Sequence, residues 1–232
     1  MRKIFLALLI GFSLSMYAQE GSEKTGIEYN NEGNEFVRNK DFKSAYNSYL
    51  KAIEIFDADG SVIDNNLIYN TGYCAFKAKK YDEAIPYFEK SIEIAYKESK
   101  PYIYLTQVYM KKKDLENMEK WVLAGLEKYE SDKSLNKLAG ICYQKQGLIF
   151  YKEGNKIKKV ANESGWNESD PDKFTAEYAR ADKEFEKALP FIEKAYKYNS
   201  NSKNTLKALQ NIYTNLEMTE EASKVKTKLD AM

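Results

Sequence analysis

A repeated arrangement of small and bulky residues constrains this chain more than any other feature. The segment FKSAYNSYLKAIEI, from Phe42, has the same arrangement as YDEAIPYFEKSIEI, from Tyr81, and segments from Leu115 and Phe185 align with both. A small or medium residue is followed by a bulky residue four positions later and by a second small residue three positions after that. These spacings fall on one face of an α-helix. In chain order, the three aligned positions hold Ala45, Ala84, Met118 and Ala188, then Tyr49, Phe88, Val122 and Ile192, then Ala52, Ser91, Gly125 and Ala195.

A second helical stretch precedes each of the first three segments. It has a small residue twelve positions before the first aligned position, at Gly33, Gly72 and Thr106. Short polar joints at 39–41, 79–80 and 112–114 separate the two stretches. The unit is therefore predicted to be helix, tight turn, helix, with small residues that let two helices approach closely.

The unit recurs with a period of 34 residues. Ala84 to Met118 is 34 residues, and so is Ala188 to Ala222, whereas Ala45 to Ala84 is 39. The five extra residues are assigned to a loop at 57–61. This period and pattern resemble the tetratricopeptide repeat, and the best-matching residues are Gly33, Phe36, Ala45, Tyr49, Ala52, Gly72, Tyr81, Ala84 and Phe88. The resemblance covers most of residues 26–232 and implies an all-α solenoid, a right-handed superhelix in which stacked pairs cover one another's apolar faces.

One repeat departs from the period, because Met118 to Ala188 is 70 residues. Residues 134–160 have no polar turn where one is due, and residues 172–199 are free of glycine and rich in Ala, Glu and Lys, which favours one long helix. We therefore predict that both helices of this repeat are lengthened into an antiparallel arm. The expected repeats lie near 26–59, 65–98, 99–132 and 133–202, followed by a capping helix pair at 203–232.

The N-terminus is predicted to be an export signal. Residues 1–18 have a basic start, an apolar core too short to span a bilayer and a small residue for cleavage after Ala18. An uncleaved membrane anchor is the alternative. We expect 19–25 to be flexible and the mature chain to have no membrane span. The end of the chain is similar to that of exported Bacteroidetes-type repeat proteins, which implies a periplasmic or envelope-associated protein with no assigned chemistry.

Composition argues against several classes of function. The chain has no His, the commonest general base and metal ligand, and shows no phosphate-binding loop or metal-ligand spacing. Its 36 basic and 35 acidic residues give no strong field for nucleic acid. Cys74 and Cys142 fall on equivalent helices of repeats two apart, about 20 Å from one another by stacking, beyond disulfide range. We expect two buried free thiols, no cofactor and no enzyme.

The first helix of each unit is expected to line the inner face of the stack, where a protein or peptide would bind. The candidate partner-binding residues are Asn30, Asn34, Arg38, Tyr69, Asn70, Tyr73, Lys77, Lys100, Ile103, Gln107, Lys111 and Lys145. Arg38, Lys77, Lys111 and Lys145 form a basic row matched to carboxylates. Alternatively, these cations complement helix dipoles. Some members of the resembled family hold a C-terminal carboxylate with a clamp of Lys, Asn, Asn, Lys and Arg; Asn34, Asn70 and Lys100 match it, but Asn30 and Tyr104 replace its Lys and Arg.

Trp166, at the tip of the arm, has two interpretations. It is either an exposed binding anchor or a ring that folds back to hold its own loop. The sequence as a whole predicts a non-catalytic interaction scaffold of the cell envelope. The alternative is a glycan-binding accessory protein, which a platform of coplanar exposed aromatics would favour. The oligomeric state is left open.

Overall fold

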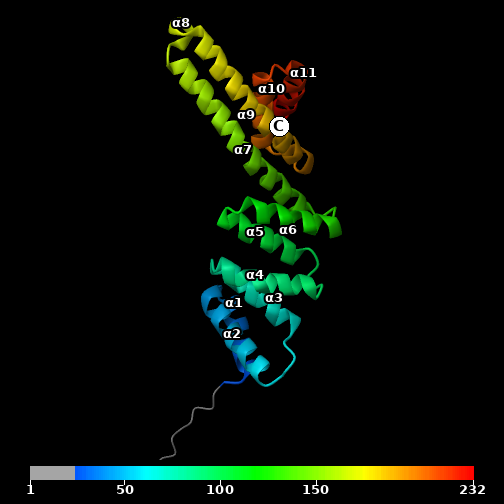
Figure 1. The fold of residues 1–232 in the computed structure, drawn as a ribbon. Helices are drawn as coiled ribbons and strands as arrows, with labels where there is room; N and C mark the ends of the chain where they lie inside the picture. The colour runs from blue at the N-terminus through cyan, green and yellow to red at the C-terminus, as the bar shows by residue number, and fades with distance from the viewer. Residues whose placement is uncertain (1–23) are drawn as a thin grey trace, which may run out of the picture.

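The computed structural model describes residues 24–232, and every regular element in this part of the chain is an α-helix. Successive helices pair side by side, and the pairs are stacked in a row (Figure 1). The predicted tetratricopeptide-like solenoid is therefore confirmed. The first three pairs are α1 (Gly26–Arg38) with α2 (Phe42–Ala58), α3 (Asn65–Lys77) with α4 (Tyr81–Glu93), and α5 (Lys100–Lys112) with α6 (Leu115–Lys128).

The turn inside each of these pairs is short and has a left-handed residue. Lys40, Lys79 and Lys113 have φ values of 60°, 63° and 61°. Where an aspartate follows this residue, it caps the second helix: a carboxylate oxygen of Asp41 accepts from the amide of Ser44 at 3.1 Å. The reversal of the chain is thus encoded locally, in two or three polar residues.

The assignment of the five extra residues to a loop at 57–61 is wrong. Helix α2 has 17 residues and continues to Ala58, whereas α4 has 13. The connection from Asp59 to Asp64 is as long as the connection from Ile94 to Ser99. Most of the insertion therefore lengthens α2 by about one helical turn.

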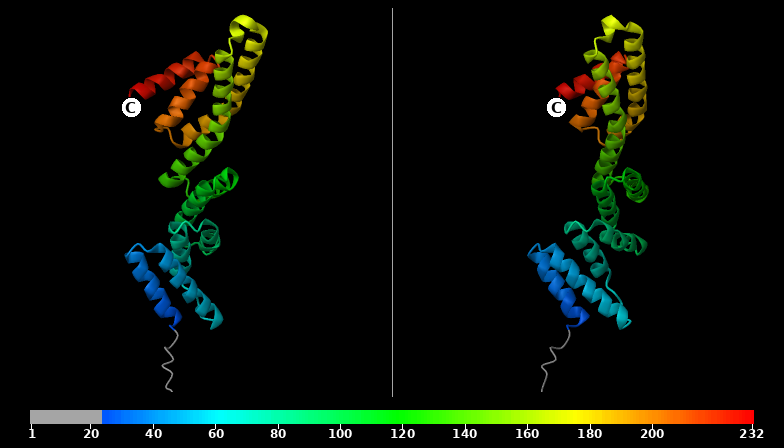
Figure 2. Two further views of the ribbon diagram at one scale, coloured as in Figure 1. Left: turned by 90° about the vertical axis from the view of Figure 1, so that its left-hand side faces the viewer. Right: turned by 60° about the vertical axis from the view of Figure 1, so that its left-hand side comes forward.

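The fourth pair forms the predicted arm. Helix α7 (Lys133–Glu163) has 31 residues and α9 (Pro171–Tyr198) has 28, so each is more than 40 Å long at about 1.5 Å per residue. The short α8 (Trp166–Ser169) joins them at the tip. The two long helices lie against each other and extend well beyond the width of the other pairs (Figure 2).

The last pair, α10 (Lys203–Asn215) and α11 (Thr219–Asp230), closes the row. Helix α10 packs on α9, so this pair lies along one side of the arm (Figures 1 and 2). The side chain of Ser202 accepts from the amide of Thr205 and caps α10.

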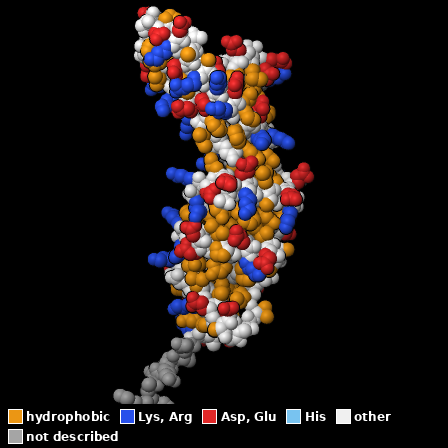
Figure 3. Space-filling model, in the orientation of Figure 1, with side chains coloured by type: hydrophobic (Ala, Val, Ile, Leu, Met, Phe, Trp, Pro, Cys, Tyr) orange, Lys and Arg blue, Asp and Glu red, His pale blue; other side chains and the backbone are white. Residues whose placement is uncertain are grey.

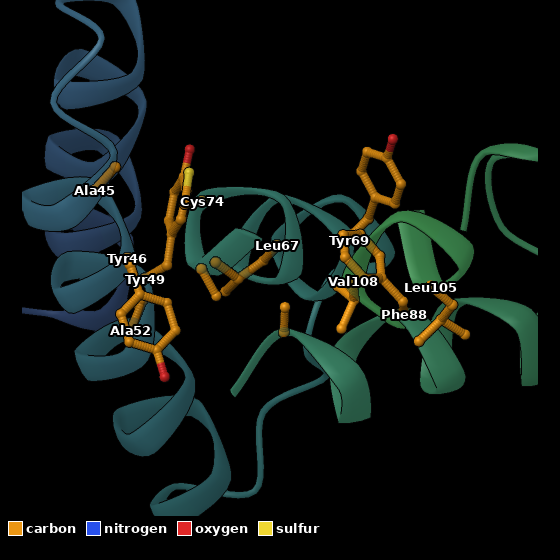
Figure 4. Close-up of a cluster of buried hydrophobic side chains, with 12 residues drawn as sticks. Ala45, Tyr46, Tyr49, Ala52, Leu67, Tyr69, Cys74, Phe88, Leu105 and Val108 are labelled. Atoms are coloured by element: carbon orange, nitrogen blue, oxygen red, sulfur yellow. The ribbon is translucent and has the colours of Figure 1, made fainter. Parts of the chain in front are cut away.

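The core runs along the row instead of gathering at one centre. Buried side chains from α2, α3, α4 and α5 follow one another in Figure 4. A second cluster joins α5, α6 and α7, and a third joins α7, α9 and α10. Cys74 and Cys142 are both buried and free, as expected, and burial raises the pKa of each thiol to about 12.

The predicted export signal, residues 1–18, lies outside the described residues. Lys24 and Thr25, expected in a flexible segment, are instead fixed to α1. Thr25 forms a capping box with Glu28, and the Lys24 ammonium lies 2.7 Å from the carboxylate of Glu32. Across residues 24–232, no helix combines the length and apolar character needed to cross a bilayer.

Candidate functional site

The predicted binding residues lie on α1, α3, α5 and α7. Helix α3 contacts α5, and α5 contacts α7. We call the exposed side of α1, α3, α5 and the first part of α7 the first-helix face. Its side chains are amides, tyrosines and cations, and these three groups differ in how far they are buried.

Two predicted asparagines meet at a buried tyrosine. Tyr49 of α2 is fully buried, and its ring packs directly onto α1 at Gly33, where a Cβ would lie only 2.4 Å from it. Its hydroxyl donates to Oδ1 of Asn34 at 2.8 Å. Burial raises the pKa of Tyr49 to about 12, and hydrogen bonding with Asn70 opposes this rise. The Tyr49 hydroxyl is therefore a neutral donor at neutral pH that helps to orient the Asn34 amide of α1.

The expectation that Tyr69 is available to a partner is wrong. Tyr69 is only 8% exposed and packs edge-on against Phe88, Tyr96 and Tyr104. It belongs to the core because aromatic rings from α4, from the connection between α4 and α5, and from α5 surround it. Tyr73, one turn later on α3, is half-buried, with its ring centroid 5.5 Å from that of Tyr104.

The cations of the predicted row are all exposed. Arg38, Lys77 and Lys111 lie in the last turns of α1, α3 and α5, where a helix dipole favours positive charge. Lys145 occupies the same repeat position but lies in the middle of α7, far from a helix end. The dipole therefore explains the first three cations and does not explain Lys145.

The remaining predicted residues differ in exposure. Asn30, Ile103 and Gln107 are half-buried, and Lys100 is exposed in the first turn of α5. At the position of the clamp arginine, Tyr104 stacks on Phe88 with centroids 5.2 Å apart. The carboxylate clamp is therefore incomplete, since core packing occupies one of its cationic positions.

Trp166 is half-buried at the tip of the arm. The Lys173 ammonium lies 3.8 Å from the centroid of the Trp166 ring. The ring also borders a small hollow with Val160 of α7 and Arg180 of α9. This placement favours the interpretation that Trp166 folds back to hold its own loop.

The sequence analysis missed a group of amides on the C-terminal half. Asn155 and Asn162 of α7 face Asn211 and Asn215 of α10 across a polar hollow, which Tyr178 of α9 also lines. A signal was present, because Asn211 and Asn215 occupy the same repeat positions as Asn34 and Arg38. However, only the folded arm places side chains of α7 and α9 opposite these two asparagines.

Within residues 24–232, no group of three or more Cys, Asp or Glu side chains is arranged to hold a metal ion. The first-helix face offers hydrogen-bond donors, acceptors and positive charge.

Comparison with known proteins identifies the fold. The model of the tetratricopeptide repeat family matches residues 66–97, and no curated protein matches the chain. YrrB, described as a TPR protein with an unusual peptide-binding site, is 18% identical over 90% of this chain and 87% of its own, with a TM-score of 0.51. MamA from Desulfovibrio magneticus RS-1 is 14% identical over 89% of this chain and 93% of its own, with a TM-score of 0.51. A TPR repeats protein from Bacteroides fragilis is 21% identical over 82% of this chain and 98% of its own, with a TM-score of 0.47. Residues 66–97 thus match a tetratricopeptide repeat, and the described residues have the fold of tetratricopeptide-repeat solenoids.

Proposed function

We propose that this protein is a non-catalytic scaffold that binds an extended protein or peptide segment on its first-helix face. The observation that carries the proposal is the row of exposed cations Arg38, Lys77, Lys111 and Lys145 at one repeat position. Lys145 continues the row into the middle of a helix, where the helix dipole gives no reason for a cation. A row shared by successive helices suits a partner that lies across them.

The neighbouring side chains suit a peptide. Half-buried amides such as Asn34, Asn70 and Gln107 supply both donors and acceptors for a main chain. The cations supply charge-assisted bonds to acidic side chains. That the fold can hold a peptide is illustrated by YrrB, whose description names a peptide-binding site.

The aromatic rings of this face do not favour the glycan alternative. Tyr73 meets Phe42 at an interplanar angle of 90° and Tyr104 at 72°. Sugar rings stack on open, flat aromatic faces, and rings set edge-to-face with one another do not present a flat shared surface.

We further propose that the protein works in the cell envelope, after removal of residues 1–18. The support is the charge, length and cleavage pattern of this segment. Cell fractionation with N-terminal sequencing of the mature chain tests it, and a cytoplasmic protein that begins at Met1 would refute it.

The binding proposal is tested by charge reversal on the first-helix face. Partners are captured from envelope extract, and the affinity of each purified partner is measured by calorimetry. The double variant Lys77→Glu and Lys111→Glu is expected to weaken a true partner at least about tenfold, since two attractive contacts become repulsive.

The matched control is Lys43→Glu with Lys226→Glu, which makes the same charge change at exposed positions of α2 and α11. Equal affinities for the two double variants would show that the partner binds elsewhere. Circular dichroism checks that both variants keep their helical content.

A further inference from the structure

The arm and α10 border an open polar hollow of about 480 Å³ between α7, α9 and α10. We call it the amide pocket, and define it by Asn155, Asn162, Tyr178, Asn211 and Asn215. It lies away from the first-helix residues of α1, α3 and α5, and its side chains are hydrogen-bonded within its walls.

The wall made by α7 and α9 is held in place by internal hydrogen bonds. The Tyr178 hydroxyl donates to Oδ1 of Asn162 at 2.6 Å, so the amide nitrogen of Asn162 keeps its hydrogens for a ligand. Nδ2 of Asn155 donates to the carbonyl of Tyr151 at 2.9 Å, which leaves Oδ1 of Asn155 as an acceptor. This wall therefore offers one donor group and one acceptor.

The wall made by α10 is arranged in a similar way. Nδ2 of Asn215 donates to the carbonyl of Asn211 at 2.8 Å and to its Oδ1 at 2.9 Å. Oδ1 of Asn215 then remains as an acceptor, and Nδ2 of Asn211 remains as a donor. Each wall thus presents one donor and one acceptor to the hollow between them.

Three charged residues also line the amide pocket, Lys158, Lys159 and Glu163, and each of them is engaged in an ion pair. The Lys158 ammonium lies 2.9 Å from the carboxylate of Asp182, and the Lys159 ammonium lies 3.8 Å from that of Glu163. A phosphate or other strong anion would find no unmatched positive charge here. The ligand should accordingly be a neutral polar group.

The ring of Tyr178 is already in contact with two side chains. Its centroid lies 4.5 Å from that of Phe174, and the Lys158 ammonium lies 4.8 Å from the Tyr178 centroid. A saccharide needs an open aromatic face to stack on, and it should therefore bind poorly in this pocket. The pocket instead suits a ligand recognised by alternating donors and acceptors.

We propose that the amide pocket binds the main chain of a short extended peptide segment, as a second site separate from the first-helix face. An extended main chain presents N–H and C=O groups alternately along both of its edges, which the two walls can engage at once. Asn155 and Asn162 are seven residues apart, about 10.5 Å along α7, which corresponds to about three extended residues. The site exists because the lengthened α7 reaches the side of α10.

The test uses the whole protein and two probes. The probes are a capped hexapeptide of alternating serine and glycine, and maltohexaose. Side-chain amide resonances of Asn155, Asn162, Asn211 and Asn215 are followed by NMR during titration. The hexapeptide is expected to shift these resonances and maltohexaose is not.

Two isosteric variants remove one donor each. Asn162→Asp keeps the acceptor for the Tyr178 hydroxyl, and Asn211→Asp keeps the acceptor for Asn215. Each is expected to weaken hexapeptide binding about fivefold, the worth of one hydrogen bond. The control Asn167→Asp, on the exposed α8, adds the same charge outside the pocket and should leave affinity unchanged.

Absence of hexapeptide-induced shifts at millimolar concentrations would overturn the proposal. So would equal affinities for Asn162→Asp and Asn167→Asp, or shifts produced by maltohexaose alone. The variant with Lys77→Glu and Lys111→Glu should bind the hexapeptide normally, so failure of the first-helix proposal and failure of this one are distinguishable.

Discussion

The three N-terminal helix pairs and the arm use the same small and bulky residues but treat one repeat position in opposite ways. Seven residues after Gly33, Gly72 and Thr106, the chain turns at Lys40, Lys79 and Lys113 with left-handed backbone. Seven residues after Gly140 it reaches Gly147, the residue best suited to such a turn, and continues as helix. The propensity of a single residue therefore does not decide where a repeat turns.

The packing of α9 against Gly147 explains the difference. A Cβ at Gly147 would lie 2.6 Å from the side chain of Ile192, so α9 packs directly onto the α7 backbone at this point. The next residue is Leu148, where the first and third pairs have the capping residues Asp41 and Asp114. The missing cap is not sufficient by itself, because α4 begins after Lys80 without a side-chain cap. The packing of α9 onto the backbone at Gly147 is what favours continued helix.

Surface composition differs between the two regions as well. In Figure 3, hydrophobic side chains gather over the lower half of the molecule, where α1 to α6 lie, and charged side chains are denser over the arm. The N-terminal pairs thus carry more apolar surface on this side, and the arm is more strongly hydrated.

The largest expected effect separates the stability of the two regions. Phe185 is fully buried between α7 and α9, against Tyr151 and Gly154. Phe185→Ala should reduce the free energy of unfolding of the arm by about 3–5 kcal/mol through lost contacts and a cavity. Hydrogen exchange should accelerate over residues 150–185, while amides of α1 to α4 keep their protection.

The matched change in the N-terminal pairs is Phe88→Ala, at an equally buried position. It should accelerate exchange in α3 to α5 and leave the arm protected, because each repeat contacts only its neighbours. If either variant loosened the whole chain equally, the row would be one cooperative unit and the two regions would not differ in this respect.

A smaller effect is expected at the position where the regions diverge. Gly147→Leu should destabilise the protein by about 1–3 kcal/mol, since the new side chain must displace Ile192 or Phe191. Denaturant unfolding measures the loss. An unchanged midpoint would mean that α9 can move away from α7 at no cost, and that close packing does not hold Gly147 in the helix.

The same contrast shows what the sequence can predict. The arm was predictable because a missing polar turn at 134–160 and a helix-favouring segment at 172–199 are local features. The placement of Tyr69 was not, because its burial depends on Tyr96 of the α4–α5 connection and on Tyr104 of α5. The amide pocket was hidden for a related reason: Asn162 and Asn211 are distant in sequence and meet only through the folded arm.

A pH-dependent effect probes the buried hydroxyl of the N-terminal pairs. Burial raises the pKa of Tyr49 from 10.0 to about 12. Because the pKa of Tyr49 is higher in the folded state, its hydroxyl contributes stability that is fully present below pH 10 and is lost as the pH rises toward 12. Tyr49→Phe should cost about 1 kcal/mol at neutral pH, through the lost bond to Asn34, and should lose less stability between pH 10 and 12.

Unfolding midpoints at pH 8, 10 and 11 compare this variant with the wild type. The wild type gives the reference dependence of the unfolding midpoint on pH, so no further control at an exposed ring is needed. Parallel pH profiles for the two proteins would show that Tyr49 ionises no later in the folded chain than in the unfolded one, contrary to its burial.

The smallest expected effect concerns the turns themselves. Lys79 is exposed and has a φ of 63°, a conformation that is unfavourable for a residue with a Cβ. Lys79→Gly removes this strain but increases the freedom of the unfolded chain, so a net gain of about 0.5 kcal/mol is expected. A loss greater than about 1 kcal/mol in denaturant unfolding would show that the lysine side chain stabilises the turn.

Paired with Gly147→Leu, this variant separates the effect of turn propensity from the effect of helix packing. A gain at Lys79→Gly would show that glycine favours the turn there through its backbone. A loss at Gly147→Leu would show that glycine is needed in α7 for packing. Together, these results would mean that tertiary contact, and not turn propensity, produces the arm.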